Sequence, residues 1–521
     1  MKINSIFKWL GCGLVMFGGL LAPEALAANC TVAALTDTGA GTGGAGDLRF
    51  CINQTNFAAG ADSINFTVRG SIPLNGGLPT ITDSLIINGN NGIIIDGQNG
   101  DGVLPVNIVA GVSVSVSIGN LTVTRGNGTM LTGGGIELRG GATLNLTNVT
   151  IDNCTTVGES GSGLYAAGSH LNVVNSRITN NYLSVFGGSG AGIFVDGGTF
   201  SMRGSVVSGN SLANSNDIGG AGIELFSVAA AQIENSIISE NRNGQFGVGI
   251  ANKFGHLRMS NVTVSNNTGG ENAGGLGNTA GTVILRNCTI AGNSVSRRGG
   301  GISNLHHTGV MIIANTVIAD NTALLDGADV LNFAELTRVG ANIVETPVSN
   351  FAVVNGTGTI ANVDPLLLPL GNYGGIVRTQ ALAPNSPARN AGTNAAALDT
   401  ADAPQILTFD TRGVGFPRFN ENTVDIGAFE SSAVAALYGV SGRVFTENGV
   451  TRSRPIVRLT DLNTGEQRFA SVNPFGFYRF LNVPAGADVR VEAAAKNAVF
   501  IPQTVTVAGE INSLNFAAQH Q

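Results

Sequence analysis

The sequence is poor in charged and aromatic side chains. Charged residues make up 12% of the 521 residues, aromatic residues make up 6%, and Trp9 is the only tryptophan. Because a charged share near ~25% is usual, this chain can form few surface ion pairs. With only five tyrosines and no tryptophan after Trp9, any contact with a sugar would rely on polar groups or on phenylalanine.

Long apolar runs are also missing after the first 27 residues, so no transmembrane segment is expected in the mature chain. Residues 1–27 are typical of a signal peptide: Lys2 and Lys8 precede an apolar run at 9–21, and the small residues at 25–27 (ALA) fit a cleavage site. The surroundings of Cys12 match a lipoprotein cleavage site poorly. We therefore expect a secreted or cell-surface protein, exported through a bacterial signal peptide.

The charge balance disfavours nucleic acid as a partner. Of the net charge of −7, residues 1–27 contribute +1 and residues 438–521 contribute +2, which leaves −10 for residues 28–437. A phosphate-binding loop, Cys/His spacing of the zinc type and a nucleophile elbow are all missing from the sequence. No cofactor is expected, and the partner considered first is an extracellular glycan or another surface.

Glycine is abundant, with 75 residues, and it accompanies a repeat of roughly 28 residues. One column of the repeat, in register with Gly204, contains Asn120, Asn148, Asn175, Asn235, Asn261, Asn287 and Asn315. A second column, six residues further along, contains Asn181, Asn210, Asn241, Asn267, Asn293 and Asn321. Two columns in phase are typical of a stack of repeated coils.

A glycine pattern recurs with the same period. The segments GGGI, GSGL, GAGI, GAGI, GVGI, AGGL and GGGI end at Ile136, Leu164, Ile193, Ile223, Ile250, Leu276 and Ile302. Short alternating segments such as ATLNLTNVTI and GTVILRNCTI separate them, and none is long enough for a helix. Three short strands per coil predict an all-β fold, a parallel β-helix over residues 76–365. Successive coils would stack about 4.8 Å apart, so equal positions would form ladders.

Asparagine is expected to have a structural role in these columns. At a turn it tolerates the left-handed conformation, and its amide can bond to the asparagine of the next coil. Asn252, Asn278 and Asn304 lie two residues beyond the hydrophobic residue that follows the glycines. Because residues i and i+2 share one face of a strand, these three should form an inward stack. A structural role is favoured over a ligand role.

Residues 28–75 are expected to form the amino-terminal cap and the first strands. Within 46–56, Leu48, Cys51, Ile52 and Thr55 recur at helical spacing, which predicts a short amphipathic helix over the open end. In an exported protein a disulfide between Cys30 and Cys51 would tie the first strand to this helix. Two further cysteines, Cys154 and Cys288, lie five coils apart and are expected to be buried thiols.

Several segments resemble known families. CTVAALTDTGAGTGGAGDLRFCINQTN and INFTVRGSIPLNGGLPTITDSLIINGN resemble secreted bacterial β-helix proteins with a CSLREA-type start. The middle resembles the right-handed parallel β-helix repeat, also found in pectate lyases. GNYGGIVRTQALAPNSPARNAG and DTRGVGFPRFNENTVDIGAFE resemble the choice-of-anchor Q module, which implies a cap of the helix at 366–430. Together these resemblances cover residues 30–430. The charged residues that match this module are interpreted as ion pairs of the cap: Asp410, Arg412, Arg418, Asp425 and Glu430.

After an alanine-rich linker at 431–437, the pattern changes to alternating strands joined by turns. Residues 438–521 predict a small β-sandwich. VSGRV, LTDLNTGE and NPFGFYRFLNVPAG resemble the carboxypeptidase regulatory-like domain, which is non-catalytic and would serve here as a spacer or docking module.

A search for catalytic groups gives little. A β-helix lyase needs acidic calcium ligands and a basic residue, and a glycoside hydrolase needs two carboxylates about 5 to 9 Å apart. The candidate acidic column contains Glu137, Tyr165, Phe194, Glu224, Ala251, Gly277 and Ser303. Its two glutamates would be three coils apart, roughly 14 Å. Asp326 and Asp329 are the closest carboxylate pair and are interpreted as turn caps. No residue is assigned a catalytic, cofactor-binding or metal-binding role.

Adjacent histidines in GGGISNLHHTGVMIIANTVIADN also raise the question of a metal site. Aligned by the asparagine ladder, His307 shares a column with Gly140, Ala167, Asp196, Ser227, Lys253 and Thr279. That composition is typical of a turn, and neither His306 nor His307 has a Cys, His or acidic partner at ligand spacing. The segment is interpreted as one coil of the scaffold.

Three functions remain open. The first is a non-catalytic, adhesin-like or glycan-contacting scaffold, whose loops 180–190 and 211–220 could shape recognition. The alternative is a polysaccharide lyase or glycoside hydrolase of the pectate-lyase-like β-helix type. The third is a purely architectural component of an outer layer. An enzyme is the less favoured interpretation.

Overall fold

The computed structural model describes residues 27–518 with short gaps. The gaps are 59, 101–105, 112, 129–132, 158–159, 185–187, 214–218, 351–353, 421, 432–436, 446–454, 463–465, 485–486, 497 and 508–509. The predicted signal peptide therefore lies almost wholly outside the described residues, and so does most of the predicted linker. No helix in the described part of the chain is long and apolar enough to cross a membrane.

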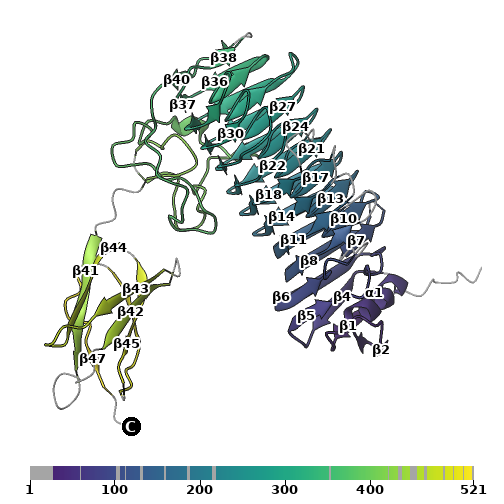
Figure 1. Ribbon diagram of the computed structural model, residues 1–521, viewed down its shortest axis with the longest axis horizontal. Coiled ribbons are helices and arrows are strands. Elements are labelled where there is room, and N and C mark those ends of the chain that lie inside the picture. Colours follow the sequence, from purple (N-terminus) through teal and green to yellow (C-terminus); the bar gives the residue numbers. More distant parts are fainter. Residues whose placement is uncertain are drawn as a thin grey trace, which may run out of the picture.

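The main body is an all-β parallel solenoid of about nine turns (Figure 1). One side, called face 1, is a ten-stranded parallel sheet. Its strands are β7 (Val106–Val109), β10 (Ile136–Arg139), β13 (Leu164–Ala167), β17 (Ile193–Asp196), β21 (Ile223–Phe226), β24 (Ile250–Lys253), β27 (Leu276–Thr279), β31 (Ile302–Asn304), β35 (Val330–Asn332) and β38 (Ser349–Asn350). The predicted glycine register is confirmed, because Ile136, Leu164 and Ile193 pair in one buried row.

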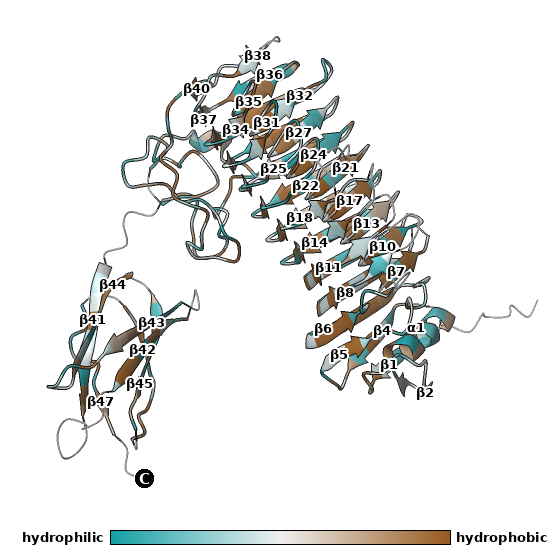
Figure 2. Ribbon diagram, viewed as in Figure 1, coloured by the Kyte–Doolittle hydropathy of each residue, from teal (hydrophilic) through white to brown (hydrophobic). Residues whose placement is uncertain are grey.

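Two further sides complete each coil. Face 2 consists of β8 (Ser115–Thr124), β11 (Thr143–Asp152), β14 (His170–Val174), β18 (Thr199–Arg203), β22 (Ala230–Glu234), β25 (His256–Ser260), β28 (Thr282–Arg286), β32 (Val310–Ala314), β36 (Glu335–Val339) and β39 (Val354–Asn355). Face 3 consists of β15 (Arg177–Thr179), β19 (Val206–Ser208), β23 (Ile237–Ser239), β26 (Thr263–Ser265), β29 (Thr289–Ala291), β33 (Val317–Ala319), β37 (Ala341–Val344) and β40 (Thr359–Ala361), while β8 and β11 continue into it. Hydrophobic residues recur from strand to strand along the stack (Figure 2).

Short strands line the turn between face 3 and face 1. They are β9 (Asn127–Gly128), β12 (Thr155–Thr156), β16 (Tyr182–Leu183) and β20 (Ser211–Leu212) in one sheet, and β30 (Ser294–Val295) and β34 (Thr322–Ala323) in another. Inward side chains from all three faces form one continuous apolar core from Cys30 to Val344. Since no single coil can bury its own apolar side, the stack depends on contacts between neighbouring coils.

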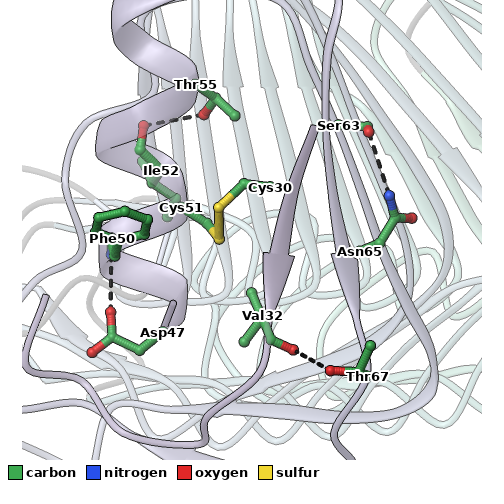
Figure 3. The surroundings of a disulfide bond; sticks show 10 residues. All are labelled: Cys30, Val32, Asp47, Phe50, Cys51, Ile52, Thr55, Ser63, Asn65 and Thr67. Atoms are coloured by element: carbon green, nitrogen blue, oxygen red, sulfur yellow. Dashed lines mark hydrogen bonds between the residues drawn. A yellow bond between two sulfur atoms is a disulfide. The ribbon is translucent and has the colours of Figure 1, made fainter. Parts of the chain in front are cut away.

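Helix α1 (Leu48–Phe57) closes the amino-terminal end, as the sequence predicts. It contacts β1 (Asn29–Val32), β3 (Ala45–Gly46) and β4 (Asp62–Phe66). The other strands of this end are β2 (Gly41–Thr42), β5 (Gly70–Pro73) and β6 (Leu85–Asp96). Asp47 caps the helix by accepting the amide hydrogen of Phe50 at 2.9 Å. The buried side chains are the four expected: Leu48, Cys51, Ile52 and Thr55. The predicted disulfide joins Cys30 to Cys51 and ties the helix to the first strand (Figure 3).

Asparagine ladders run along the stack at two turns. The residues of the first column have φ between 46° and 57° and so adopt the left-handed conformation. Within it, the amide of Asn148 donates to the side-chain oxygen of Asn120 at 3.0 Å, and Asn261 donates to Asn235 at 3.0 Å. In the second, fully buried column, each asparagine donates to the next, from Asn181 to Asn321. These bonds satisfy buried backbone and side-chain groups together.

The inward stack predicted from the sequence is also present. Asn252 donates to Asn278 and Asn278 donates to Asn304, both at 2.9 Å, and the series extends to Asn332. All four side chains are buried.

The segment 366–430, called here the flank segment, contains the 3-10 helix η1 (Asn394–Ala396) and otherwise consists of turns and bridges. It packs along face 3: Thr379 bonds to Thr263 at 2.8 Å, and the amide of Ala428 donates to Thr289 at 3.0 Å. Asn261 donates to the carbonyl of Phe409 at 2.8 Å. The segment therefore covers the side of the later coils.

The carboxy-terminal part contains two small sheets. One holds β41 (Leu437–Phe445), β44 (Phe477–Pro484) and β47 (Phe516–Ala517), and the other holds β42 (Ile456–Asp461), β43 (Gln467–Ser471), β45 (Asp488–Ala494) and β46 (Gln503–Thr506). The two sheets share an apolar core that includes Val457, Phe480 and Val491. The buried hydroxyl of Tyr478 donates to the carbonyl of Leu514 at 2.6 Å, so its hydrogen-bonding capacity is used inside the core.

Candidate functional site

Most of the chemically distinctive side chains of the solenoid lie on the outer side of face 1. Because strand residues alternate, the residues that follow the buried row point outward together. Register places Glu137 beside Tyr165, Tyr165 beside Phe194, and Phe194 beside Glu224. The predicted acidic column is thus aligned as expected. Two residues further along, a second outward row contains Arg139, Ala167, Asp196, Phe226, Lys253 and Thr279.

Arg139 and two aromatic rings form the first group on this face. The guanidinium of Arg139 lies 4.6 Å from the centre of the Tyr165 ring and forms an ion pair with Glu137. Tyr165 stacks on Phe194, with ring centres 5.4 Å apart and planes 14° apart. Burial raises the pKa of Tyr165, and Arg139 opposes that shift. The phenol therefore stays protonated at neutral pH and can serve as a hydrogen-bond donor.

A buried ion pair forms the second group. The ammonium of Lys253 lies 2.7 Å from Glu224, whose side chain is 2% exposed. The other oxygen of Glu224 accepts the amide hydrogen of Gly220 at 3.0 Å. Burial raises the pKa of Glu224, and the Lys253 ammonium opposes the rise. A buried charge is tolerated when it is both paired and hydrogen-bonded, and this glutamate meets both conditions.

An exposed aromatic pair completes the face. Phe226 and Phe254 meet edge to face with ring centres 5.8 Å apart, and their side chains are 38% and 56% exposed. Phe254 has φ of +63°, a conformation that is unusual for a bulky residue. The equivalent residues in the two neighbouring coils, Ser227 and Ala280, are also left-handed, but their side chains are small. The chain therefore holds a large ring where the backbone favours a small residue, a strain that is found at functional positions.

The alignment of the coils by the first asparagine column did not reveal the Phe226–Phe254 pair, because at this turn it shifts some coils by one residue. The structure pairs Asp196 with Phe226 and Phe226 with Lys253, so Ser227 lies one residue beyond that row. The placement of His307 beside Thr279 was likewise wrong, because Asn278 pairs with Asn304 and the histidines lie in the turn that follows. The sequence did contain a signal for this pair: Phe226 ends its strand at a turn, and Phe254 begins the same turn in the next coil.

The rings of His306 and His307 have centres 4.3 Å apart and are tilted by 34°, and the Nδ1 atom of His306 is hydrogen-bonded to the Thr308 hydroxyl at 2.8 Å. Within the described residues, no group of three or more His, Cys, Asp or Glu side chains is arranged to hold a metal ion. Asp329 accepts the Asn321 amide at 3.0 Å and continues the second ladder by one position, while Asp326 accepts a bond from Ser349. The tips of the loops 180–190 and 211–220, at 185–187 and 214–218, lie outside the described residues.

The five charged residues that match the choice-of-anchor pattern (Asp410, Arg412, Arg418, Asp425 and Glu430) are all buried and lie close together in the flank segment. Arg412 donates to Asp410 at 2.7 and 2.9 Å and lies between the rings of Phe416 and Phe429, about 4 Å from each. Its guanidinium also donates to the carbonyl of Glu430 at 2.6 Å.

Arg418, at 0% exposure, links the same cluster to the solenoid. It donates to the carbonyl of Asp425 at 2.7 Å and to the side chain of Asn287 at 3.2 Å. Burial raises the pKa of Glu430 to about 8, although Arg418 lies 3.7 Å away and opposes the rise. The cluster thus anchors the flank segment to the first asparagine ladder.

Cys154 and Cys288, the other two cysteines among the described residues, are buried thiols, as predicted. Burial raises the pKa of each to about 12, so neither forms a thiolate at neutral pH.

The fold and this face define a parallel β-solenoid with a charged and aromatic outer side, joined to a small β-sandwich. No family model matches the sequence, and no curated protein matches it. Among solved structures, that of pectate lyase Pel9A is similar, with 13% identity and a TM-score of 0.46; the match covers 78% of this chain and 98% of the lyase chain.

Proposed function

We propose that this protein is an exported, non-catalytic scaffold that contacts glycans outside the cell, with face 1 as a contact surface. The observation that carries the proposal is the exposed Phe226–Phe254 pair, next to the Tyr165–Phe194 stack and the Arg139 guanidinium. Aromatic faces pack against the apolar side of a sugar ring, and guanidinium and phenol groups can bond to its hydroxyls.

The charged groups of face 1 support binding more than bond cleavage. Glu137 is paired with Arg139, and Glu224 is paired with Lys253, so each carboxylate is neutralised by its own neighbour. A glycosidase needs one carboxylic acid and one carboxylate on opposite sides of the same bond. The enzyme alternative rests on Glu224, because burial raises its pKa in the way that suits a general acid.

Several finer assignments belong to the same proposal. Residues 1–27 would be a signal peptide, and the solenoid would be a right-handed β-helix with a CSLREA-type start at 28–75. The flank segment would be a choice-of-anchor Q module, and residues 438–521 would be a carboxypeptidase regulatory-like domain that spaces or docks the solenoid. The Cys30–Cys51 disulfide favours an oxidising location outside the cytoplasm.

Affinity electrophoresis of the full chain through gels that contain a panel of neutral and acidic polysaccharides tests the proposal. We expect at least one polysaccharide to retard the protein, and the Phe226→Ala, Phe254→Ala double variant to lose most of that retardation. Val414→Ala, which removes an 85% exposed side chain elsewhere, is the matched control. Equal mobility in every gel would contradict glycan binding, and a new reducing end or an unsaturated product would support the enzyme alternative.

A further inference from the structure

Face 2 carries a continuous row of uncharged polar side chains that is separate from face 1. Register aligns Ser117, Asn145, Asn172, Ser201 and Gln232 in successive coils. Within this row Asn172 donates to Asn145, and Ser201 donates to Asn172, both at 2.9 Å. Each of these side chains is partly exposed, so the row presents hydroxyl and amide groups to the outside at the coil spacing of about 4.8 Å.

This polar row leads into a notch where the flank segment rises above face 2. Arg258 follows Gln232 in register, pairs with Asp402 and donates to the carbonyl of Thr400 at 3.5 Å. The wall of the notch thus comes from a segment more than 140 residues away in the sequence. The hollow measures about 320 Å³, within the range of small-ligand sites. Its lining includes Ala230, Gln232, His256, Arg258, Thr282, Ile284 and Asp402.

Much of the charge around the notch is paired, and the nearby Arg286 donates to the backbone carbonyl of Asp399 at 2.7 Å. Arg258 is neutralised by Asp402, and Arg203 lies 3.9 Å from Glu234. Glu234 also accepts the hydroxyl of Thr400 at 2.6 Å and its amide at 3.0 Å, which fixes the base of the wall. An anionic ligand would have to compete with Asp402 for Arg258. A neutral ligand with many hydroxyl groups would meet no such competition.

We propose that the polar row and the notch together form a binding site for a neutral polysaccharide, with the chain lying along the solenoid axis and one sugar seated in the notch. From Ser117 to Arg258 the row spans five coil steps, about 24 Å, which gives room for several sugar units. Amide and hydroxyl groups in the row offer donors and acceptors to ring hydroxyls. The apolar surface of Ala230 and Ile284 in the notch can pack against the less polar side of the ring.

This inference rests on the proposed function in taking a glycan as the ligand, but it places the ligand on a different face. The test is calorimetric titration of the full chain with neutral hexasaccharides (β-1,4-glucan, β-1,3-glucan, α-1,4-glucan and β-1,4-mannan) and with a hexasaccharide of uronic acid. Ala230→Trp fills the notch, and Asn172→Ala with Gln232→Ala strips the row. Ala361→Trp adds the same bulk to an exposed site in the last coil and is the matched control.

At least one neutral hexasaccharide should bind, with Kd raised about tenfold or more by Ala230→Trp, raised less by the double variant and unchanged by Ala361→Trp. Thermal unfolding at the wild-type temperature would show that each variant is folded. Unchanged affinity in Ala230→Trp, or preference for the uronic hexasaccharide, would overturn the inference. If only the Phe226 and Phe254 variants lose binding, the proposed function is supported and the site on face 2 is contradicted. If no saccharide binds, both proposals are contradicted.

Discussion

The solenoid and its flank segment differ in the groups that form hydrogen bonds to their buried polar atoms. In the solenoid, many buried polar groups bond to neutral amides that repeat in successive coils, such as the Asn241–Asn267–Asn293 series. In the flank segment, charged groups form the bonds of the buried cluster around Arg412 and Arg418, and among the described residues the Nε and Nη1 atoms of Arg418 have no hydrogen-bond partner. A repeated fold can use a short-range neutral bond many times. An irregular segment without neighbouring copies depends on a few strong, charge-assisted bonds.

Removal of Arg418 should have the largest effect on the stability of the flank segment. Arg418→Met removes the buried cation that donates to the Asp425 carbonyl and lies 3.7 Å from Glu430, which should destabilise the flank segment by about 3–5 kcal/mol. Hydrogen exchange over residues 405–431 measures that loss directly. Arg378→Gln is the control, because Arg378 and Glu240 are each 40% exposed and their pair should contribute less than about 1 kcal/mol. Equal protection in Arg418→Met and wild type would show that the cluster does not hold the segment.

Breaking one rung of the neutral ladder should cost less. Asn267 donates to Asn293 and to the carbonyl of Ile238, and it accepts from Asn241. Asn267→Ala should lower the free energy of unfolding by about 1–3 kcal/mol, since both neighbours lose a buried partner. The midpoint of urea denaturation measures this loss. Its neighbour Asn266 is exposed and left-handed, so Asn266→Gly should be close to neutral; an equal loss in both would contradict the ladder account.

The two regions should also differ in their response to pH. The pKa of Glu430 is raised from 4.5 to about 8, so the folded flank segment takes up a proton more readily than the unfolded chain does. The stability that this group contributes is therefore complete below pH 4.5 and is lost as pH rises through about 8. The protection factors of residues 405–431, in which the intrinsic rise of amide exchange with pH is divided out, should fall over that interval in the wild type, and Glu430→Gln should reduce the fall. The same slope in Glu430→Gln would assign it to another group.

The smallest effect concerns the strained ring on face 1. Phe254→Gly removes a bulky side chain from φ of +63° and should raise the free energy of unfolding by about 1 kcal/mol, despite the loss of its contact with Phe226. Ala280→Gly, at φ of +58° one coil away, provides the comparison without a ring. A loss of stability in Phe254→Gly would mean that the ring packs for structure and is not held there against backbone preference.

The repeating part of the molecule could be predicted from the sequence in detail. The glycine and asparagine columns fixed which residues share a row, because each coil repeats one set of backbone demands; Asn252, Asn278 and Asn304 stack inward as expected. The helix at the amino-terminal end and the Cys30–Cys51 disulfide followed from helical spacing and from the expectation of export.

The surface features could not be predicted in the same way. Turns differ in length from coil to coil, so an alignment by one asparagine column slips by a residue at the opposite turn and hides the Phe226–Phe254 contact. The notch on face 2 depends on Asp402, which meets Arg258 only after the chain has returned along the stack. Neither spacing nor periodicity indicates where an irregular segment of 65 residues (366–430) will pack.

A protein that binds a glycan without cutting it should leave the polysaccharide at its full length. This can be measured by size-exclusion chromatography with light scattering, applied to the full chain after long incubation with each polysaccharide that retards it in a gel. We predict co-elution of protein and polysaccharide with the molar mass of the polymer unchanged. A steady fall in polymer mass that Glu224→Gln abolishes would contradict the proposed function and identify an enzyme.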